Sequence, residues 1–160
     1  MKIQGGGRRI LVVDDDLAIR VLLQAVLTRM NFVVELAEDG EAGLSRLRQL
    51  HSQLDLILLD LMMPKVNGYE FLHQMTGICQ GQRPHIIVFT AAGQRGVDKI
   101  PSNAVCNSIL KPFDLETFVE MIRACVAGDH PAMSGEIAFD PETTLGSRFA
   151  REQDRSRQPD

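Results

Sequence analysis

The chain has 160 residues, of which 44% are hydrophobic and 24% are charged, and its formal net charge at pH 7 is −4. This composition is that of an ordinary globular protein, and the negative charge argues against nucleic acid or an anionic membrane as the partner. Since no apolar run approaches the roughly 18 residues of a membrane helix, we expect a cytoplasmic protein without membrane insertion.

Five short apolar stretches, rich in leucine or β-branched residues, predict the buried strands of a sheet. They cover residues 9–13, 32–37, 56–59, 85–90 and 105–110. The segments after the strands have apolar residues at helical spacing, and three aspartates are suited to cap helices there: Asp16, Asp39 and Asp114. The segment after residue 90 predicts only a weak helix, because two glycines and Pro101 interrupt it.

This alternation of strands and helices predicts an α/β fold with a parallel sheet. Near-continuous apolar strands indicate that helices cover both faces of the sheet. Right-handed crossovers leave few topologies, and we expect the flavodoxin-like, doubly wound, five-stranded order 2-1-3-4-5. In that order the first and third strands are neighbours, and the switch point of the sheet lies between their carboxyl ends.

The sequence predicts one domain over residues 8–127, preceded by a flexible N-terminus at residues 1–7. Residues 128–160 are rich in glycine, proline, serine and charged residues, and they lack a sustained amphipathic period. We expect this segment to be a flexible C-terminal extension, with partial docking through its few large apolar residues as the alternative.

The three cysteines of the chain, Cys79, Cys106 and Cys125, are widely spaced and include no CxxC pair. An odd number at such spacings is not a disulfide framework or a zinc site. The pattern predicts reduced, mostly buried thiols in a cytosolic protein.

Five polar residues stand where the predicted strands end. Asp14 and Asp15 follow the first strand and Asp60 follows the third, while Thr90 ends the fourth and Lys111 follows the fifth. Because parallel strands present their carboxyl ends at one edge, we expect these side chains to lie together. Crowded carboxylates repel one another, and a hard divalent cation such as Mg²⁺ relieves that repulsion.

With a metal bound, Asp60 is a candidate nucleophile toward a phosphoryl group, which would give an aspartyl phosphate. The Lys111 ammonium would neutralise charge, and the Thr90 hydroxyl would donate a hydrogen bond to a phosphoryl oxygen. Taken alone, each has a simpler interpretation: a capped strand end, a solvated loop lysine and an ordinary strand threonine. Their convergence on one acidic cluster favours the chemical interpretation.

The motifs that carry these residues resemble the receiver domain of two-component response regulators over roughly residues 8–127. They are Leu11-Val12-Val13-Asp14-Asp15, Asp60-Leu61-Met62-Met63-Pro64 with Gly68, Thr90-Ala91 and Lys111-Pro112-Phe113. The resemblance implies that Asp60 is the phosphoacceptor and that Asp15, Asp60 and the Met62 carbonyl ligate Mg²⁺, with Asp14 acting mainly through water. It also implies that a sensor histidine kinase or a histidine phosphotransfer protein supplies the phosphoryl group.

By the same resemblance we expect a signalling protein and not a metabolic enzyme, and its downstream protein is unknown. We also expect no output domain fused to this domain. Ser108 departs from the family pattern, which usually has Tyr or Phe there, so the readout of phosphorylation is expected to differ. A phosphate shuttle or sink is the alternative to a switch. A flavin protein or an Asp-dependent phosphatase is disfavoured, because aromatic residues are few and Met62 stands where such phosphatases carry a second Asp.

Overall fold

The computed structural model describes residues 6–128 of the chain. Most of the expected flexible N-terminus and nearly all of the expected C-terminal extension lie outside the described residues, so both stay predictions. Within residues 6–128, no helix has the length and apolar character that crossing a membrane requires.

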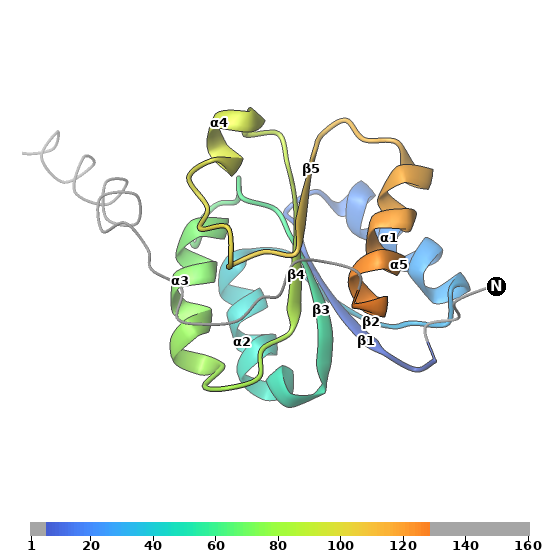
Figure 1. The fold of residues 1–160 in the computed structure, drawn as a ribbon, viewed down its shortest axis with the longest axis horizontal. Coiled ribbons are helices and arrows are strands. Elements are labelled where there is room, and N and C mark those ends of the chain that lie inside the picture. The colour runs from blue at the N-terminus through green and yellow to red at the C-terminus, as the bar shows by residue number, and fades with distance from the viewer. Residues whose placement is uncertain (1–5, 129–160) are drawn as a thin grey trace, which may run out of the picture.

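The core of the molecule is a parallel sheet with the strand order β2-β1-β3-β4-β5 (Figure 1). Its strands are β1 Arg9–Val13, β2 Val33–Ala37, β3 Leu54–Leu59, β4 His85–Thr90 and β5 Asn107–Leu110. The predicted doubly wound order is therefore confirmed, and β1 and β3 are neighbours at the switch point.

Strand register brings the functional edge together. Val13 ends β1 and pairs with Leu59, which ends β3. The next residues therefore leave the sheet side by side, and the backbone N–H of Asp60 donates to the Val13 carbonyl at 3.0 Å. At the other side of β3, the backbone N–H of Lys111 donates to the carbonyl of Thr90 at 2.8 Å.

The helices begin where the capping residues predict. They are α1 Leu17–Arg29, α2 Gly40–Leu50, the short 3-10 helix η1 His51–Gln53, α3 Gly68–Ile78, α4 Gly93–Val97 and α5 Leu115–Ala127. Asp16, Asp39 and Asp114 accept hydrogen bonds from first-turn N–H groups of α1, α2 and α5, which confirms the three predicted caps. Asn67 caps α3 in the same way, by accepting a hydrogen bond from the N–H of Glu70. The five-residue α4 agrees with the predicted weak helix.

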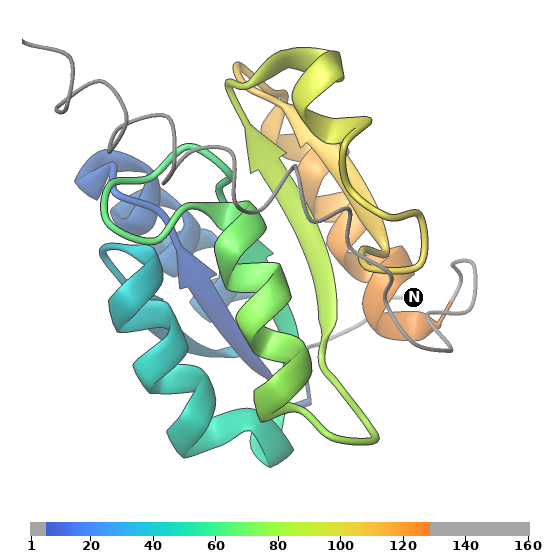
Figure 2. The ribbon, with the colours of Figure 1, turned by 90° about the vertical axis from the view of Figure 1, so that its left-hand side faces the viewer.

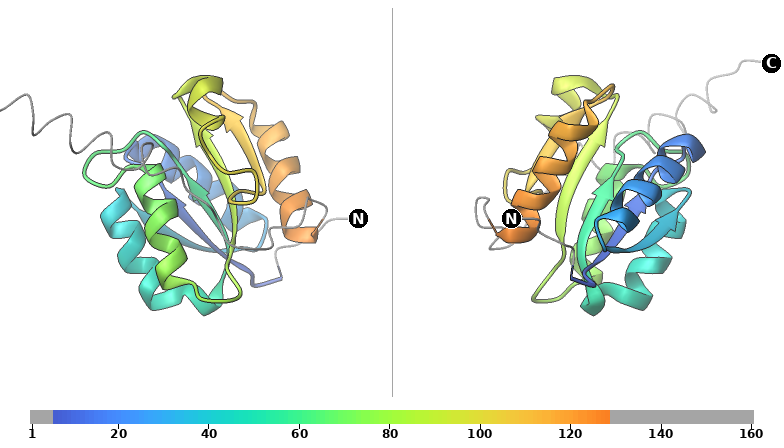
Figure 3. Two further views of the ribbon diagram at one scale, coloured as in Figure 1. Left: turned by 60° about the vertical axis from the view of Figure 1, so that its left-hand side comes forward. Right: turned by 90° about the vertical axis from the view of Figure 1, so that its right-hand side faces the viewer.

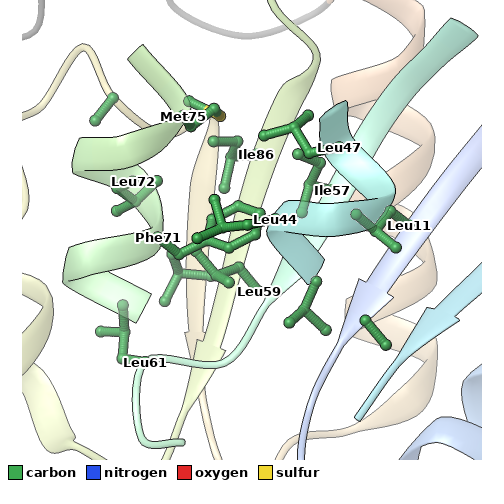
Figure 4. Packing of buried hydrophobic residues seen from close by; sticks show 14 of the residues in the cluster. Leu11, Leu44, Leu47, Ile57, Leu59, Leu61, Phe71, Leu72, Met75 and Ile86 are labelled. Atoms are coloured by element: carbon green, nitrogen blue, oxygen red, sulfur yellow. The ribbon is translucent and has the colours of Figure 1, made fainter. Parts of the chain in front are cut away.

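Helices cover both faces of the sheet. Helices α2 and α3 lie on one face, which comes forward in Figure 2, and α1 and α5 lie on the other, which the right-hand view of Figure 3 presents. Figure 4 shows the first of the two apolar layers, where side chains of α2 and α3 pack on the sheet. Its labelled members are Leu11, Leu44, Leu47, Ile57, Leu59, Leu61, Phe71, Leu72, Met75 and Ile86.

The outer strands are less buried than the central ones. Strands β1, β3 and β4 are almost fully buried, but Val33 of β2 is 40% exposed and Leu110 of β5 is 37% exposed. The prediction that helices cover both faces of the sheet is confirmed, although the outer strands β2 and β5 keep part of their surface exposed. Both are edge strands with a single neighbour, so part of their apolar surface stays accessible.

The structure corrects the prediction for the cysteines. Cys106 and Cys125 form a disulfide with their Cα atoms 6.4 Å apart, while Cys79 is a buried free thiol. The bond joins the residue before β5 to α5 across a separation of 19 residues. The sequence does not predict this pair, because only the packing of α5 on the sheet brings the two cysteines together.

Gly68 and Gly77, both in α3, provide a matched test of this packing. A Cβ at Gly68 would lie 2.6 Å from the Leu61 Cα and 2.7 Å from the Asp60 carbonyl oxygen, whereas one at Gly77 would meet nothing within 4 Å. We expect Gly68→Ala to lower the free energy of unfolding by roughly 1–3 kcal/mol, because backbone atoms obstruct the added methyl. Gly77→Ala should raise it by up to about 1 kcal/mol, since alanine is the better helix former. Urea unfolding measures both, and effects of the same sign would contradict the packing.

Candidate functional site

Three aspartates form an acidic cluster at the carboxyl ends of β1 and β3. One carboxylate oxygen from each of Asp14, Asp15 and Asp60 lies within 4.8 Å of the others. Asp14 is fully buried and Asp60 is 3% exposed, whereas Asp15 is exposed. The sequence prediction that these strand ends converge is therefore confirmed as geometry, and the chemical roles of the three residues stay predictions.

Backbone N–H groups hold the two inner carboxylates. Asp14 Oδ1 accepts from the N–H of Asp16 at 2.8 Å, and Asp60 Oδ1 accepts from the N–H of Met62 at 3.1 Å. Each contact spans two residues, so it fixes the carboxylate on the turn that follows its own strand. The second oxygen of each group, Oδ2, then faces the centre of the site.

Lys111 places its ammonium between the two inner carboxylates. Its Nζ lies 2.7 Å from Asp14 Oδ2 and 3.3 Å from Asp60 Oδ2, and its side chain is 17% exposed. The same Nζ lies 5.0 Å from the centroid of the Phe89 ring, which adds a cation–π contact. One cation therefore balances part of the charge of three carboxylates.

Burial dominates the electrostatics of the inner carboxyls. It raises the pKa of both Asp14 and Asp60 above the ordinary value of 3.8, although their hydrogen bonds and Lys111 act in the opposite direction. Burial alone would lower the pKa of Lys111, but its contacts with the two aspartates outweigh this and raise it.

The donor set suits a hard divalent cation. Carboxylate oxygens are the ligands that Mg²⁺ prefers, and three of them converge here from Asp14, Asp15 and Asp60. Asp15 is exposed and can offer its carboxylate from the solvent side. These three residues fit the expected ion and would hold it together with the predicted Met62 carbonyl.

The remaining predicted residues lie at the same edge but have different contacts. Thr90 is fully buried, and its Oγ1 accepts a hydrogen bond from the N–H of Ala92 at 3.1 Å. The side chain of Met62 is 57% exposed, and its backbone N–H supports Asp60. The expected parts played by the Thr90 hydroxyl and the Met62 carbonyl stay predictions.

Two contacts of the site were missed by sequence reasoning. The Arg20 guanidinium donates to the backbone carbonyl of Asp14 at 2.7 Å, which supports the turn after β1. The Phe89 ring faces Lys111 from the neighbouring strand. Neither residue belongs to a recognisable motif, and only strand register and helix packing bring them to the site.

The fold and this acidic site define a class, the flavodoxin-like proteins of the receiver type. Residues 10–123 match the family model described as response regulator receiver domain, and the chain belongs to this family. The resemblance stated from the sequence is thereby confirmed. Receiver domains are signalling domains rather than metabolic enzymes, and they typically bind Mg²⁺ at an acidic site. Response regulators receive phosphoryl groups from histidine kinases.

Similar proteins include longer response regulators. Response regulator ArlR of Staphylococcus epidermidis is 36% identical over 117 residues, which are 72% of this chain and 51% of that protein. Response regulator MprA of Mycolicibacterium vanbaalenii is 34% identical over 153 residues, which are 88% of this chain and 64% of that protein. The chain therefore spans between half and two thirds of the length of these relatives.

Solved receiver structures share the fold. A CheY-like receiver domain protein from Methanospirillum hungatei superposes with a TM-score of 0.69 at 26% identity, covering 76% of this chain and 95% of that one. The response regulator TrrA of Thermotoga maritima, in complex with Mg²⁺ and BeF, superposes with a TM-score of 0.63 at 30% identity, covering 74% of this chain and 98% of that one.

The raised pKa of Asp14 predicts how stability depends on pH without metal. Because the folded protein binds this proton more tightly than the unfolded chain, stability falls as the pH rises from 3.8 through the folded pKa. In EDTA at neutral pH, Asp14→Asn should therefore raise the melting temperature, and the gain should shrink as the pH is lowered toward 3.8. Thermal melts across pH measure both effects.

Asp16→Asn is the matched control, since it removes the same charge from an exposed position and asparagine caps helices as well as aspartate does. It should change the melt little at any pH. Added Mg²⁺ should stabilise the wild type by mass action more than it stabilises Asp14→Asn. A lower melting temperature for Asp14→Asn in EDTA at neutral pH would contradict the burial effect.

Proposed function

We propose that the domain is a phosphorylation-dependent switch that accepts a phosphoryl group on Asp60 with Mg²⁺ and thereby changes its binding to a downstream protein. The donor is a phosphohistidine on a sensor histidine kinase or a histidine phosphotransfer protein. The observation that carries the proposal is the position of Lys111 Nζ, which contacts Asp60 Oδ2 at 3.3 Å inside a cluster of three carboxylates.

The contacts of Asp60 orient its carboxylate for nucleophilic attack. Its Oδ1 is held by the Met62 N–H and its Oδ2 faces Lys111, so the carboxylate is oriented before a donor arrives. A bond forms between an Asp60 oxygen and phosphorus as the bond from phosphorus to the donor imidazole nitrogen breaks, and the imidazole takes up a proton. Phosphoryl transfer asks a protein mainly for such positioning and for neutralisation of charge.

Neutralisation is divided between the lysine and the metal. Mg²⁺, when bound by Asp14, Asp15, Asp60 and the Met62 carbonyl, would supply positive charge beside the phosphoryl oxygens. Lys111 is closer to Asp14 than to Asp60, so the ammonium pairs mainly with Asp14 before a phosphoryl group arrives. A phosphoryl group on Asp60 would bring nearly two more negative charges and attract this ammonium away from Asp14.

Thr90 supports the same proposal from the far side of β3. Its Oγ1 already accepts a hydrogen bond from the Ala92 N–H, so the hydroxyl hydrogen remains the group to donate to a phosphoryl oxygen. Drawing Thr90 toward the acceptor would move the loop that follows β4. Movement of that loop is how the modification would reach a partner protein.

Substitution of the acceptor tests the proposal. With acetyl phosphate and Mg²⁺, we expect the wild-type protein to gain a single phosphoryl adduct and Asp60→Asn to gain none, because the amide is not a comparable nucleophile. Intact-protein mass spectrometry measures the adduct directly.

Asp16→Asn is again the control, because Asp16 is a neighbouring aspartate whose side chain caps α1, and this variant should be modified like the wild type. Lys111→Ala should be modified more slowly, since it loses the contact with Asp60. An adduct of wild-type yield on Asp60→Asn would overturn the assignment of the acceptor.

A further inference from the structure

Three contacts connect the loop after β3 to the loop after β4, and the first is at Thr90. The Thr90 hydroxyl is held by the N–H of Ala92 at 3.1 Å. Ala92 immediately precedes α4 and is its N-terminal boundary residue. The orientation of the hydroxyl beside the acidic site therefore depends on where α4 begins.

The second contact fixes α4 to α3. The Tyr69 hydroxyl donates a hydrogen bond of 2.7 Å to the carbonyl of Gly96, the buried residue of α4. A Cβ at Gly96 would lie 2.7 Å from the Ala92 Cβ and 3.0 Å from the Tyr69 hydroxyl oxygen. Glycine is therefore the residue that allows the tyrosine and the first turn of α4 to approach so closely.

The third contact brings the tyrosine back to the acceptor. Tyr69 follows Gly68, where a Cβ would lie 2.7 Å from the backbone carbonyl oxygen of Asp60. The N–H of Gly68 also donates to the Leu61 carbonyl at 3.0 Å. The start of α3 is thus packed directly on the backbone of the acceptor residue.

Together these contacts form a continuous path from Asp60 through Gly68, Tyr69 and α4 to Thr90. We propose that Tyr69 is a positioning residue for phosphoryl acceptance: its hydroxyl ties α4 to α3, and through Ala92 it holds the Thr90 hydroxyl in place for a group on Asp60. This inference rests on the proposed function and deepens it, because it names the side chain that links the two loops of the site.

The phenol is suited to this part. Burial raises the pKa of Tyr69, so the hydroxyl stays protonated and donates at neutral pH. The Tyr69 ring packs against the apolar layer of α2 and α3, and this packing fixes the position of its hydroxyl. Tyr69 is also the aromatic residue nearest in sequence to the acceptor Asp60.

Removing the Tyr69 hydroxyl while keeping its ring tests the inference in the 160-residue chain. We expect Tyr69→Phe to bind beryllofluoride, in the presence of Mg²⁺, roughly two- to ten-fold more weakly, which is the range that loss of one hydrogen bond gives. Fluorine NMR titration of the bound adduct measures the affinity. In a Thr90→Val background, Tyr69→Phe should weaken binding no further, because the hydrogen bond from Tyr69 to Gly96 acts through the Thr90 hydroxyl.

Thr76→Val is the matched control, since it removes a side-chain hydrogen bond of 2.7 Å from the exposed face of the same helix. It should leave the affinity unchanged. The chain has one tyrosine and no tryptophan, so intrinsic fluorescence of the wild type reports on Tyr69 alone. That fluorescence should change on beryllofluoride binding and not with fluoride alone.

Equal affinities of Tyr69→Phe and the wild type, or an equal loss in Thr76→Val, would overturn the inference, as would additive losses in the double variant. Unchanged wild-type fluorescence on saturation would overturn it as well. A wild-type protein that binds no beryllofluoride would instead overturn the proposed function. If the wild type and Tyr69→Phe both bind it with equal affinity, only the positioning role of Tyr69 would be overturned.

Discussion

Repulsion among carboxylates at the carboxyl edge of the sheet is the interaction on which the rest of the site depends. Two like unit charges about 4 Å apart repel each other by roughly 4 kcal/mol at an effective dielectric of 20. The fold places three aspartates within 4.8 Å and buries two of them, so their charge must be balanced from outside the cluster. Lys111 supplies one positive charge, and the three carboxylates are oxygen donors of the kind that a divalent cation prefers.

Strand register forces the carboxylates together and so imposes this repulsion on the fold. Val13 and Leu59 end their strands side by side, so the residues that follow cannot separate without breaking the sheet. The apolar layers on both faces of the central strands stabilise that register. The site is therefore a charged edge on a well-packed sheet, and a further anion on Asp60 would change the contacts that Lys111 makes.

Most of the fold and the membership of the acidic cluster could be predicted from the sequence, because apolar strands ending in aspartates report both topology and position. Contacts formed only by tertiary packing could not. The disulfide of Cys106 and Cys125 and the bond from Tyr69 to Gly96 join residues 19 and 27 positions apart, without a local signal. The partial exposure of β2 and β5 has no local signal either, because apolar composition does not distinguish a central strand from an edge strand.

The central claim is that Lys111 is the counter-charge that moves when Asp60 acquires an anion. A crystal structure of the full chain with Mg²⁺ and beryllofluoride tests it most directly. We predict that beryllium bonds to an Asp60 carboxylate oxygen and that Lys111 Nζ leaves Asp14, now 2.7 Å away, to contact a fluoride. Beryllofluoride bound elsewhere, or a Lys111 that keeps its contact with Asp14 and makes none with the fluoride, would contradict the claim.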